Sequence, residues 1–244
     1  MSETMTAAHD RVAEDKEFKD RLARQRRSFQ AALPLYLAVP AAIAALIHAG
    51  GHPVQWGLAA AGAAGWWLAL VLRAPAALLG RKLPPAALNR LVVGASGPLE
   101  EGVRVAAVLW LAPGFSGALW LGWGWASIEV LFTIANGLVL LRLLDRDDDK
   151  SRQVRAILEA RGTFSDAAPW LGVIERILAS AVHVGFTLVV AAAPALALVT
   201  APVHSALNLA VNHLSRRMGL FLALLALAAA VVLGAGLALF AAGR

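Results

Sequence analysis

The sequence predicts an all-α polytopic membrane protein with about seven transmembrane helices. Of its 244 residues, 59% are hydrophobic, and the mean hydropathy is +0.66. A soluble domain of this length has no need of so much apolar surface. Apolar runs of about 20 residues recur along the chain, and a helix of that length spans the hydrocarbon core of a bilayer. Together these observations favour a multi-pass helical protein over a soluble one.

The predicted spans follow one another closely. They cover residues 29–49, 54–72, 88–112, 117–140, 171–195, 198–214 and 220–242. Residues 1–28 form a charged N-terminal arm, and residues 29–244 form a single transmembrane domain. Lys and Arg gather in the arm and in alternate connections, which the positive-inside rule assigns to the cytoplasm. We therefore predict a cytoplasmic N-terminus, a C-terminus outside, and a cytoplasmic loop at about 144–168 that contains a charged helix.

Two adjacent acids and one base lie inside the third predicted span. These are Glu100, Glu101 and Arg104. One such charge at the bilayer centre costs about 2.5–3.5 kcal/mol on insertion scales. The three side chains must therefore face other protein groups or a water-filled cavity. Gly94 and Pro98 predict that this span is interrupted just before the acids, and interrupted helices line cavities or pack inside protein.

Further ionisable and amide groups occur in three later spans. They are Glu129, then Glu175, Arg176 and His183, then His204 and Asn208. Because successive spans run in opposite directions, most of these groups fall at a similar depth in the bilayer. The sequence therefore predicts one shared polar site, built by the third to sixth spans and surrounded by apolar helices.

The order of these motifs is similar to that of the YhfC-type membrane peptidases. It comprises EExxR at 100–104, GxGxxxxE at 122–129, an ER pair followed by His183, and HxxxN at 204–208. Those peptidases resemble the PrsW proteases and the CAAX-protease and bacteriocin-processing group of glutamic intramembrane proteases. The resemblance covers roughly residues 88–213, which is most of the predicted membrane core.

The resemblance implies roles for the catalytic candidates. Glu100 would activate a water molecule with Glu101 as its partner, His204 and Asn208 would form the oxyanion hole, and His183 would orient water or assist proton transfer. Supporting roles fall to Arg104, Glu129, Glu175 and Arg176. The chain departs from the CAAX pattern, because EExxR is one residue shorter than EExxxR and Trp125–Glu129 replaces FxxxH. The choice of base and the role of Glu129 are therefore left open.

Metal-free chemistry is the favoured expectation, with no cofactor required. Glu and His can also bind zinc, so zinc stays an alternative, with Glu100, Glu129, His183 and His204 as the ligands if a metal is bound. The chain has no HExxH motif and no cysteine, which excludes cysteine ligands and a cysteine nucleophile.

The expected function is intramembrane endopeptidase activity in the bacterial cytoplasmic membrane. The expected partners are the lipid bilayer and a substrate that is a membrane-anchored protein or lipidated peptide. Nucleic acid is not expected, because the basic residues follow the topology. Two alternatives are a non-catalytic scaffold of the same superfamily and a proton-coupled secondary transporter. A rhomboid-type serine protease is disfavoured, because Ser116 of the GFSG segment is expected in a short turn and the HxxxN motif at 204–208 comes after it rather than before.

Overall fold

The protein is helical throughout the part of the chain that the structure describes. This computed structural model describes the backbone of residues 2–146, 148–160, 169–214 and 217–243, and the side chains of 16–146, 148–149, 151–155, 170–211, 214 and 217–243. Its elements are α1 (Ser2–Ala49), α2 (Trp56–Val71), α3 (Arg73–Leu79), α4 (Pro85–Gly94), α5 (Ser96–Leu111), α6 (Phe115–Leu144), α7 (Asp149–Ala160), α8 (Pro169–Ala192), η1 (Pro194–Leu196), α9 (Ala197–Leu214) and α10 (Met218–Ala242). The all-α prediction is confirmed.

Six helical stretches within the described residues are long and apolar enough to cross a membrane. They are Lys16–Ala49, Trp56–Leu79, Phe115–Leu144, Trp170–Ala192, Pro194–Val211 and Met218–Ala242. The chain is therefore a multi-pass membrane protein of the all-α class. The predicted third span, 88–112, is divided between α4 and α5, which have 10 and 16 residues. The count of seven spans stays a prediction.

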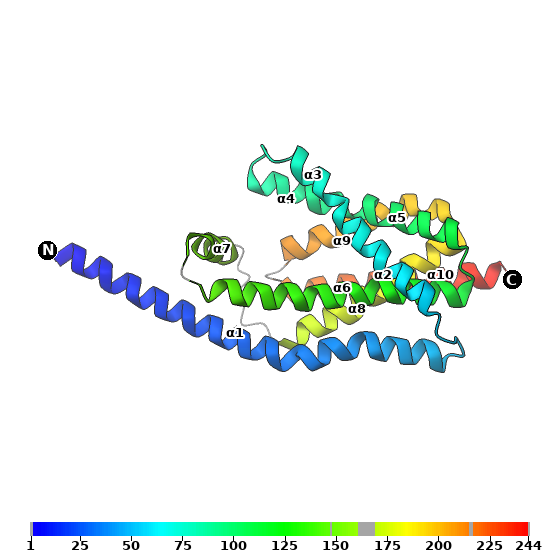
Figure 1. The fold of residues 1–244 in the computed structure, drawn as a ribbon, viewed down its shortest axis with the longest axis horizontal. Helices are drawn as coiled ribbons and strands as arrows, with labels where there is room; N and C mark the ends of the chain where they lie inside the picture. Colours follow the sequence, from blue (N-terminus) through cyan, green and yellow to red (C-terminus); the bar gives the residue numbers. More distant parts are fainter. Residues whose placement is uncertain (1, 147, 161–168, 215–216, 244) are drawn as a thin grey trace.

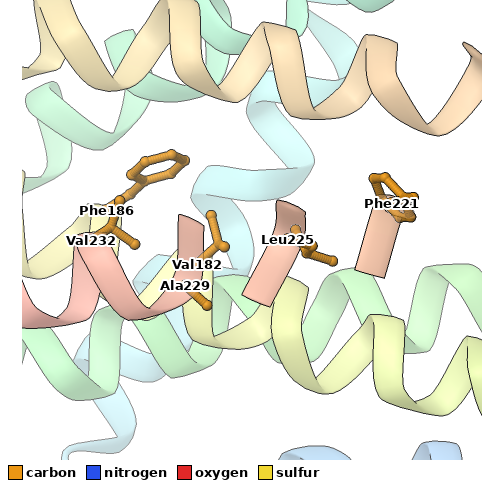
Figure 2. Close-up of a cluster of buried hydrophobic side chains, with 6 residues drawn as sticks. All are labelled: Val182, Phe186, Phe221, Leu225, Ala229 and Val232. Atoms are coloured by element: carbon orange, nitrogen blue, oxygen red, sulfur yellow. The ribbon is translucent and has the colours of Figure 1, made fainter. Parts of the chain in front are cut away.

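The long helices lie side by side around α8 (Figure 1). In the apolar part of α8, 61% of the residues are buried, against 28% or less in the other five stretches. Figure 2 shows part of the reason, an apolar cluster in which Val182 and Phe186 of α8 lie along a row of α10 side chains that includes Val232 beside Phe186. The end of α6, α7, the start of α8 and the end of α9 share one end of the bundle, which we call the α7 end.

Close approach between two helix pairs depends on glycine. A Cβ atom at Gly124 of α6 would overlap the carbonyl group of Ala59 of α2. At Gly97 of α5 it would overlap the carbonyl oxygen of Ala201 of α9. Small residues allow backbones to come close inside a membrane, where helix association depends on van der Waals packing. These glycines thus set how near α2 and α9 lie to the polar interior.

The junction between α4 and α5 lies where the sequence predicts an interruption. Pro98 has no backbone N–H, so the carbonyl group of Gly94 lacks its usual partner four residues later. The hydroxyl group of Ser205 in α9 donates to that carbonyl oxygen at 2.6 Å. The side chain of Ser96 donates to the carbonyl oxygen of Val93 at 2.6 Å. The interruption is therefore satisfied by side chains, and it ties α9 to the start of α5.

The charged N-terminal region continues directly into the first apolar helix. Helix α1 has 48 residues and passes the predicted boundary at residue 28 without a break. Phe18 and Leu22 of α1 pack against Leu144 at the end of α6, and the guanidinium of Arg155 in α7 lies over the Phe18 ring. The charged helix predicted within the 144–168 loop is α7, whereas residues 161–168 lie outside the described chain.

Candidate active site

Glu101 is the most fully bonded acid of the site. Its side chain is 1% exposed. Arg104, one turn later in α5, donates from Nε to both carboxylate oxygens at 3.2 Å. Helix α9 supplies two more partners: the hydroxyl group of Thr200 donates to Oε2 at 3.0 Å, and Nδ1 of His204 lies 2.9 Å from Oε1. Both oxygens of Glu101 are therefore occupied.

Glu100 is equally buried but less evenly bonded. Its oxygen Oε1 pairs with the guanidinium of Arg73, at the start of α3. Its other oxygen, Oε2, accepts a hydrogen bond from Nε1 of Trp125 in α6 at 3.1 Å. Nε2 of His204 lies 3.5 Å from the same Oε2, beyond the usual length of a hydrogen bond. Glu100 therefore has one loosely engaged side, and that side faces His204.

His204 lies between the two carboxylates. Because Nδ1 lies 2.9 Å from a carboxylate oxygen of Glu101, the proton of a neutral ring belongs on Nδ1, as an N–H that donates to that oxygen. Nε2 then carries the lone pair and points towards Glu100. A second proton on Nε2 would convert it to a donor directed at the same place. The imidazole can thus pass between an accepting and a donating state beside Glu100.

Arg104 connects this pair of acids to helix α8. Its side chain is fully buried and lies over the Trp125 ring, 4.2 Å from the ring centre. It donates to the hydroxyl group of Thr187 and to the carbonyl oxygen of His183. Its NH2 group lies 3.3 Å from Nδ1 of His183. Since a guanidinium can only donate, Nδ1 of His183 accepts, and the ring proton lies on Nε2.

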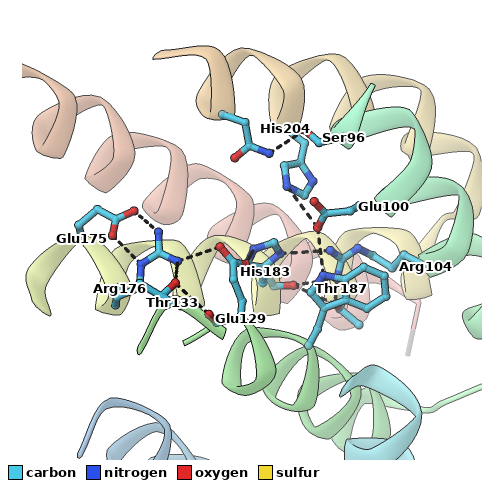
Figure 3. Close-up of polar contacts among 12 residues, drawn as sticks. Ser96, Glu100, Arg104, Glu129, Thr133, Glu175, Arg176, His183, Thr187 and His204 are labelled. Atoms are coloured by element: carbon cyan, nitrogen blue, oxygen red, sulfur yellow. Dashed lines mark hydrogen bonds and ion pairs between the residues drawn. The ribbon is translucent and has the colours of Figure 1, made fainter. Parts of the chain in front are cut away.

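The polar network continues from His183 to the α7 end. Nε2 of His183 pairs with Glu129 of α6, whose other oxygen accepts from Arg176 at 2.8 Å. Arg176 also holds Glu175 through a two-pronged contact. Figure 3 shows this continuous row of side chains from Glu175 to the Glu100 region. Acidic and basic groups alternate along this row, so each buried charge has a partner of opposite sign or a hydrogen bond, as buried ionisable groups require.

Asn208 lies one turn after His204 and is tied to the α5 junction. Its Nδ2 donates to the hydroxyl group of Ser96 at 2.8 Å. An amide nitrogen carries two hydrogens, so this contact accounts for one of them. The structure therefore brings together every residue of the predicted constellation, with Asn208 at its edge and Glu175 and Arg176 joined to it through Glu129.

Three members of the constellation are close enough to share a metal ion. Ligand atoms of Glu100, His183 and His204 lie within 4.8 Å of one another. Glu101 on Nδ1 of His204 is the kind of outer partner that metal-bound histidines have. In contrast, Arg104 occupies Nδ1 of His183, which leaves a proton on Nε2 and no lone pair for a metal. In this hydrogen-bonding arrangement, only two of the three groups offer a free ligand atom.

Several residues that contact the site lie outside the predicted constellation. Arg73 was assigned only to a basic connection, and nothing in its spacing indicates Glu100. Thr187 and Thr200 were also missed. A signal existed for both, since Thr187 follows His183 by four residues and Thr200 precedes His204 by four, which places each on the same helix face. Trp125 was noted only as the aromatic residue of a motif, without a contact to Glu100.

Ser116 takes no part in this network. It lies in the first turn of α6, where its hydroxyl group accepts a hydrogen bond from Gln55 at 3.2 Å. The short turn expected at Ser116 is therefore wrong, because Phe115, Ser116 and Gly117 already belong to helix α6.

Comparison of the chain with protein-family models, with curated proteins and with solved structures found no match. The motif resemblance described above therefore stays a prediction.

Proposed function

We propose that this chain is an intramembrane endopeptidase that hydrolyses a membrane-anchored protein or peptide. The observation that carries the proposal is the position of His204 between two buried carboxylates, 2.9 Å from Glu101 and 3.5 Å from Glu100. General-base catalysis needs a group that accepts a proton from water. Here the carboxylate of Glu100 is that group, and the imidazole of His204 beside it can accept or donate a hydrogen bond. A purely structural ion pair requires no titratable ring between its two acids.

Glu100 is the base in this proposal, and Glu101 positions His204. Both oxygens of Glu101 already accept hydrogen bonds from Arg104, Thr200 and the imidazole, so a water molecule would have to displace a partner to reach it. Oε2 of Glu100 accepts a hydrogen bond from Trp125 and otherwise faces Nε2 of His204 at 3.5 Å, which is longer than a hydrogen bond. This assignment also agrees with the role that the motif resemblance gives to the first acid of EExxR.

The reaction follows from these positions. Glu100 takes a proton from water as the water oxygen bonds to the carbonyl carbon of the substrate peptide. His204, protonated on Nε2, and the second amide hydrogen of Asn208 donate to the oxyanion that forms. The carbon–nitrogen bond then breaks, and the proton held by Glu100 passes to the leaving nitrogen. The products are one new carboxyl terminus and one new amino terminus.

Metal-free catalysis is part of the proposal. His183 could act as a zinc ligand only if Arg104 left its Nδ1 atom, or if the ring lost the proton that it holds on Nε2. Zinc on Glu100 and the histidines is the alternative, and it would polarise the carbonyl group and activate the water.

The membrane topology of the proposal has seven spans, with α4 and α5 together forming the third. Basic residues gather in α1, before α4 and around α7, so the positive-inside rule assigns the α7 end to the cytoplasm. The proposed location is the cytoplasmic membrane of a bacterium, and the site then lies between the two surfaces.

The test compares protein termini in membranes of the native host that contain wild type or Glu100→Gln at equal levels. Glu17→Gln is the matched control, since Glu17 is an exposed residue of α1, far from the site in the sequence, that pairs with Arg21. We expect new termini close to membrane-spanning segments in wild type and in the control, and their loss in Glu100→Gln. Identical termini in all three strains would overturn the proposal.

Proton-coupled transport is a second candidate, favoured by the unbroken row of ionisable groups from Glu175 to Glu100. Transporters use such rows as proton relays. Proton uptake by proteoliposomes in response to a pH gradient, lost in Glu129→Gln, would support this candidate. A chain with neither activity would be the scaffold alternative.

A further inference from the structure

A cavity lies against the polar row, between α6, α8, α9 and α10. Its volume is about 40 Å³, and the residues around it include Arg176, Ala179, His183, His204, Leu207 and Val211. It touches both histidines of the site. His204 in turn lies 3.5 Å from Glu100, so the cavity ends one side chain away from the proposed base.

The cavity belongs to the α7 end of the bundle. Its lining residues are Glu129, near the middle of α6, together with residues within 175–183 of α8, 204–211 of α9 and 221–225 of α10. The start of α8 and the end of α9 share that end of the bundle (Figure 1). Arg176 and Glu175 lie nearest the start of α8, whereas His183 lies two turns deeper. The charged pair is therefore on the outer side of the cavity, and the histidines form its inner wall.

The cavity suits water better than an apolar group. A water molecule needs roughly 10–15 Å³ on this scale and two to four polar partners. The space thus holds roughly three water molecules, and Glu129, Arg176, His183, His204 and Asn208 all border it. It is much smaller than an extended peptide or a lipid chain requires. Leu207 and Val211 add apolar lining to the cavity, which keeps its polar lining residues.

We propose that this cavity is the entrance through which water reaches the site, from the side of the membrane that carries α7. Its role as the source of the hydrolytic water rests on the proposed function. The presence of water in it does not, because hydration follows from the size and lining of the cavity alone.

The chain has no cysteine, so single cysteines report water without background labelling. A thiol reacts with a methanethiosulfonate only as the thiolate, which forms in water and not in an apolar core. Ala179→Cys and Val211→Cys place a thiol at the inner and outer parts of the cavity. Matched controls are Ala118→Cys, in an apolar cluster and fully buried, and Val199→Cys, on α9 with 59% exposure towards lipid.

The full chain is labelled in membranes with a small, membrane-impermeant methanethiosulfonate. We expect Ala179→Cys and Val211→Cys to react roughly tenfold or more faster than their controls, in keeping with the need for a hydrated thiolate. In sealed vesicles they should react only when the α7 side faces the reagent, which a tag on α7 establishes. Equal rates at Ala179→Cys and Ala118→Cys, or labelling from the opposite side, would overturn the proposal.

If the Ala179→Cys protein does not accumulate, Leu207→Cys places the thiol at another lining residue of the same cavity. Protection of Val211→Cys by added lipid or detergent would show an apolar occupant and would also overturn the proposal. Labelling requires no hydrolysis, so a hydrated cavity in a protein that cuts nothing would contradict the proposed function and leave the entrance intact. A cavity without water in a protein that does cut its substrate would overturn the proposed entrance and leave the proposed function intact.

Discussion

Nδ1 of His204 lies 2.9 Å from Oε1 of Glu101, although the two residues are 103 positions apart in the chain. This contact joins α9 to α5 in the buried centre of the protein. The two neighbouring acids differ in how they meet this ring, since Glu101 lies 2.9 Å from Nδ1 whereas Glu100 lies 3.5 Å from Nε2, beyond the usual length of a hydrogen bond. The difference can be tested by neutralising each acid in turn.

Glu101→Gln should destabilise the protein more than Glu100→Gln does. Removing one partner of a buried ion pair costs about 3–5 kcal/mol, because the remaining charge stays buried. Arg104 would lose its carboxylate in Glu101→Gln, whereas Arg73, the partner of Glu100, is partly exposed at 22% and can be solvated. Thermal unfolding of both variants in the same detergent measures this. A lower stability for Glu100→Gln would show that the assignment is reversed.

Trp125→Phe should reduce the proposed activity while leaving most of the stability. The substitution keeps a ring beneath Arg104 but removes the indole N–H that donates to Glu100 at 3.1 Å. Hydrogen bonds to charged groups contribute about 1.5–3 kcal/mol, which corresponds to a loss of roughly 10- to 100-fold if the bond is needed in the transition state. The rate at which a substrate found by terminus mapping is cut provides the measurement. Trp67→Phe, on the partly exposed surface of α2, is the control.

Pro98→Ala should reduce the contribution of Ser205 to the free energy of unfolding. Alanine restores a backbone N–H that can bond to the carbonyl group of Gly94, which now depends on Ser205 at 2.6 Å. Ser205→Ala alone should therefore cost about 0.5–1.5 kcal/mol and clearly less in the Pro98→Ala background. Unfolding measurements on the two single variants and the double variant give the coupling free energy. Strict additivity would mean that Ser205 does not replace the missing bond.

Gly124→Ala should be destabilising by about 1–3 kcal/mol, as overpacking usually is. The added Cβ would meet the backbone of Ala59, which cannot move aside as a flexible side chain can. Gly234→Ala in α10 is the matched control, since nothing lies within 4 Å of its added Cβ. The control should be neutral or slightly stabilising because alanine favours helix. Equal effects at both positions would contradict the close contact between α2 and α6.

The start of α7 should lose a stabilising contact in acid. The backbone N–H of Ser151, 2.8 Å from Oδ1 of Asp148, holds the pKa of that carboxyl below its ordinary value of 3.8. A carboxyl whose pKa is lowered by folding stabilises the folded state above its unfolded pKa, and this contribution disappears as pH falls through the folded pKa. A lower protection of the Ser151 amide against hydrogen exchange, relative to the intrinsic rate at the same pH, is expected below about pH 3.8, and already at neutral pH in Asp148→Ala.

Much of the architecture was predictable because membrane spans are encoded locally. Apolar length predicted the long helices, and Gly94 with Pro98 predicted the junction between α4 and α5. The grouping of Glu100, Glu101, His183 and His204 was predictable too, since buried charges need partners and few other groups were present.

The contact pattern within the site was less accessible. Arg73 reaches Glu100 from a helix that begins directly after α2, and no periodicity reports such a tertiary approach. The attachment of Asn208 to Ser96 depends on how closely α9 approaches α5, which Gly97 permits but does not specify. Local sequence patterns identify which side chains are buried, whereas the choice among several chemically suitable partners depends on the packed arrangement.

The separation of Glu101 from its α9 partners has a consequence for biosynthesis. Thr200 and His204 are made 99 and 103 residues after Glu101, which at about 5–20 residues per second is a delay of roughly 5–20 s. During that interval only Arg104, in the same helix, can neutralise the acid within the membrane. We therefore expect the α4–α5 segment to wait at the insertion machinery or the membrane surface until α9 emerges from the ribosome. Nascent chains that stop at residue 196 should leave this segment open to added protease, whereas complete chains should protect it.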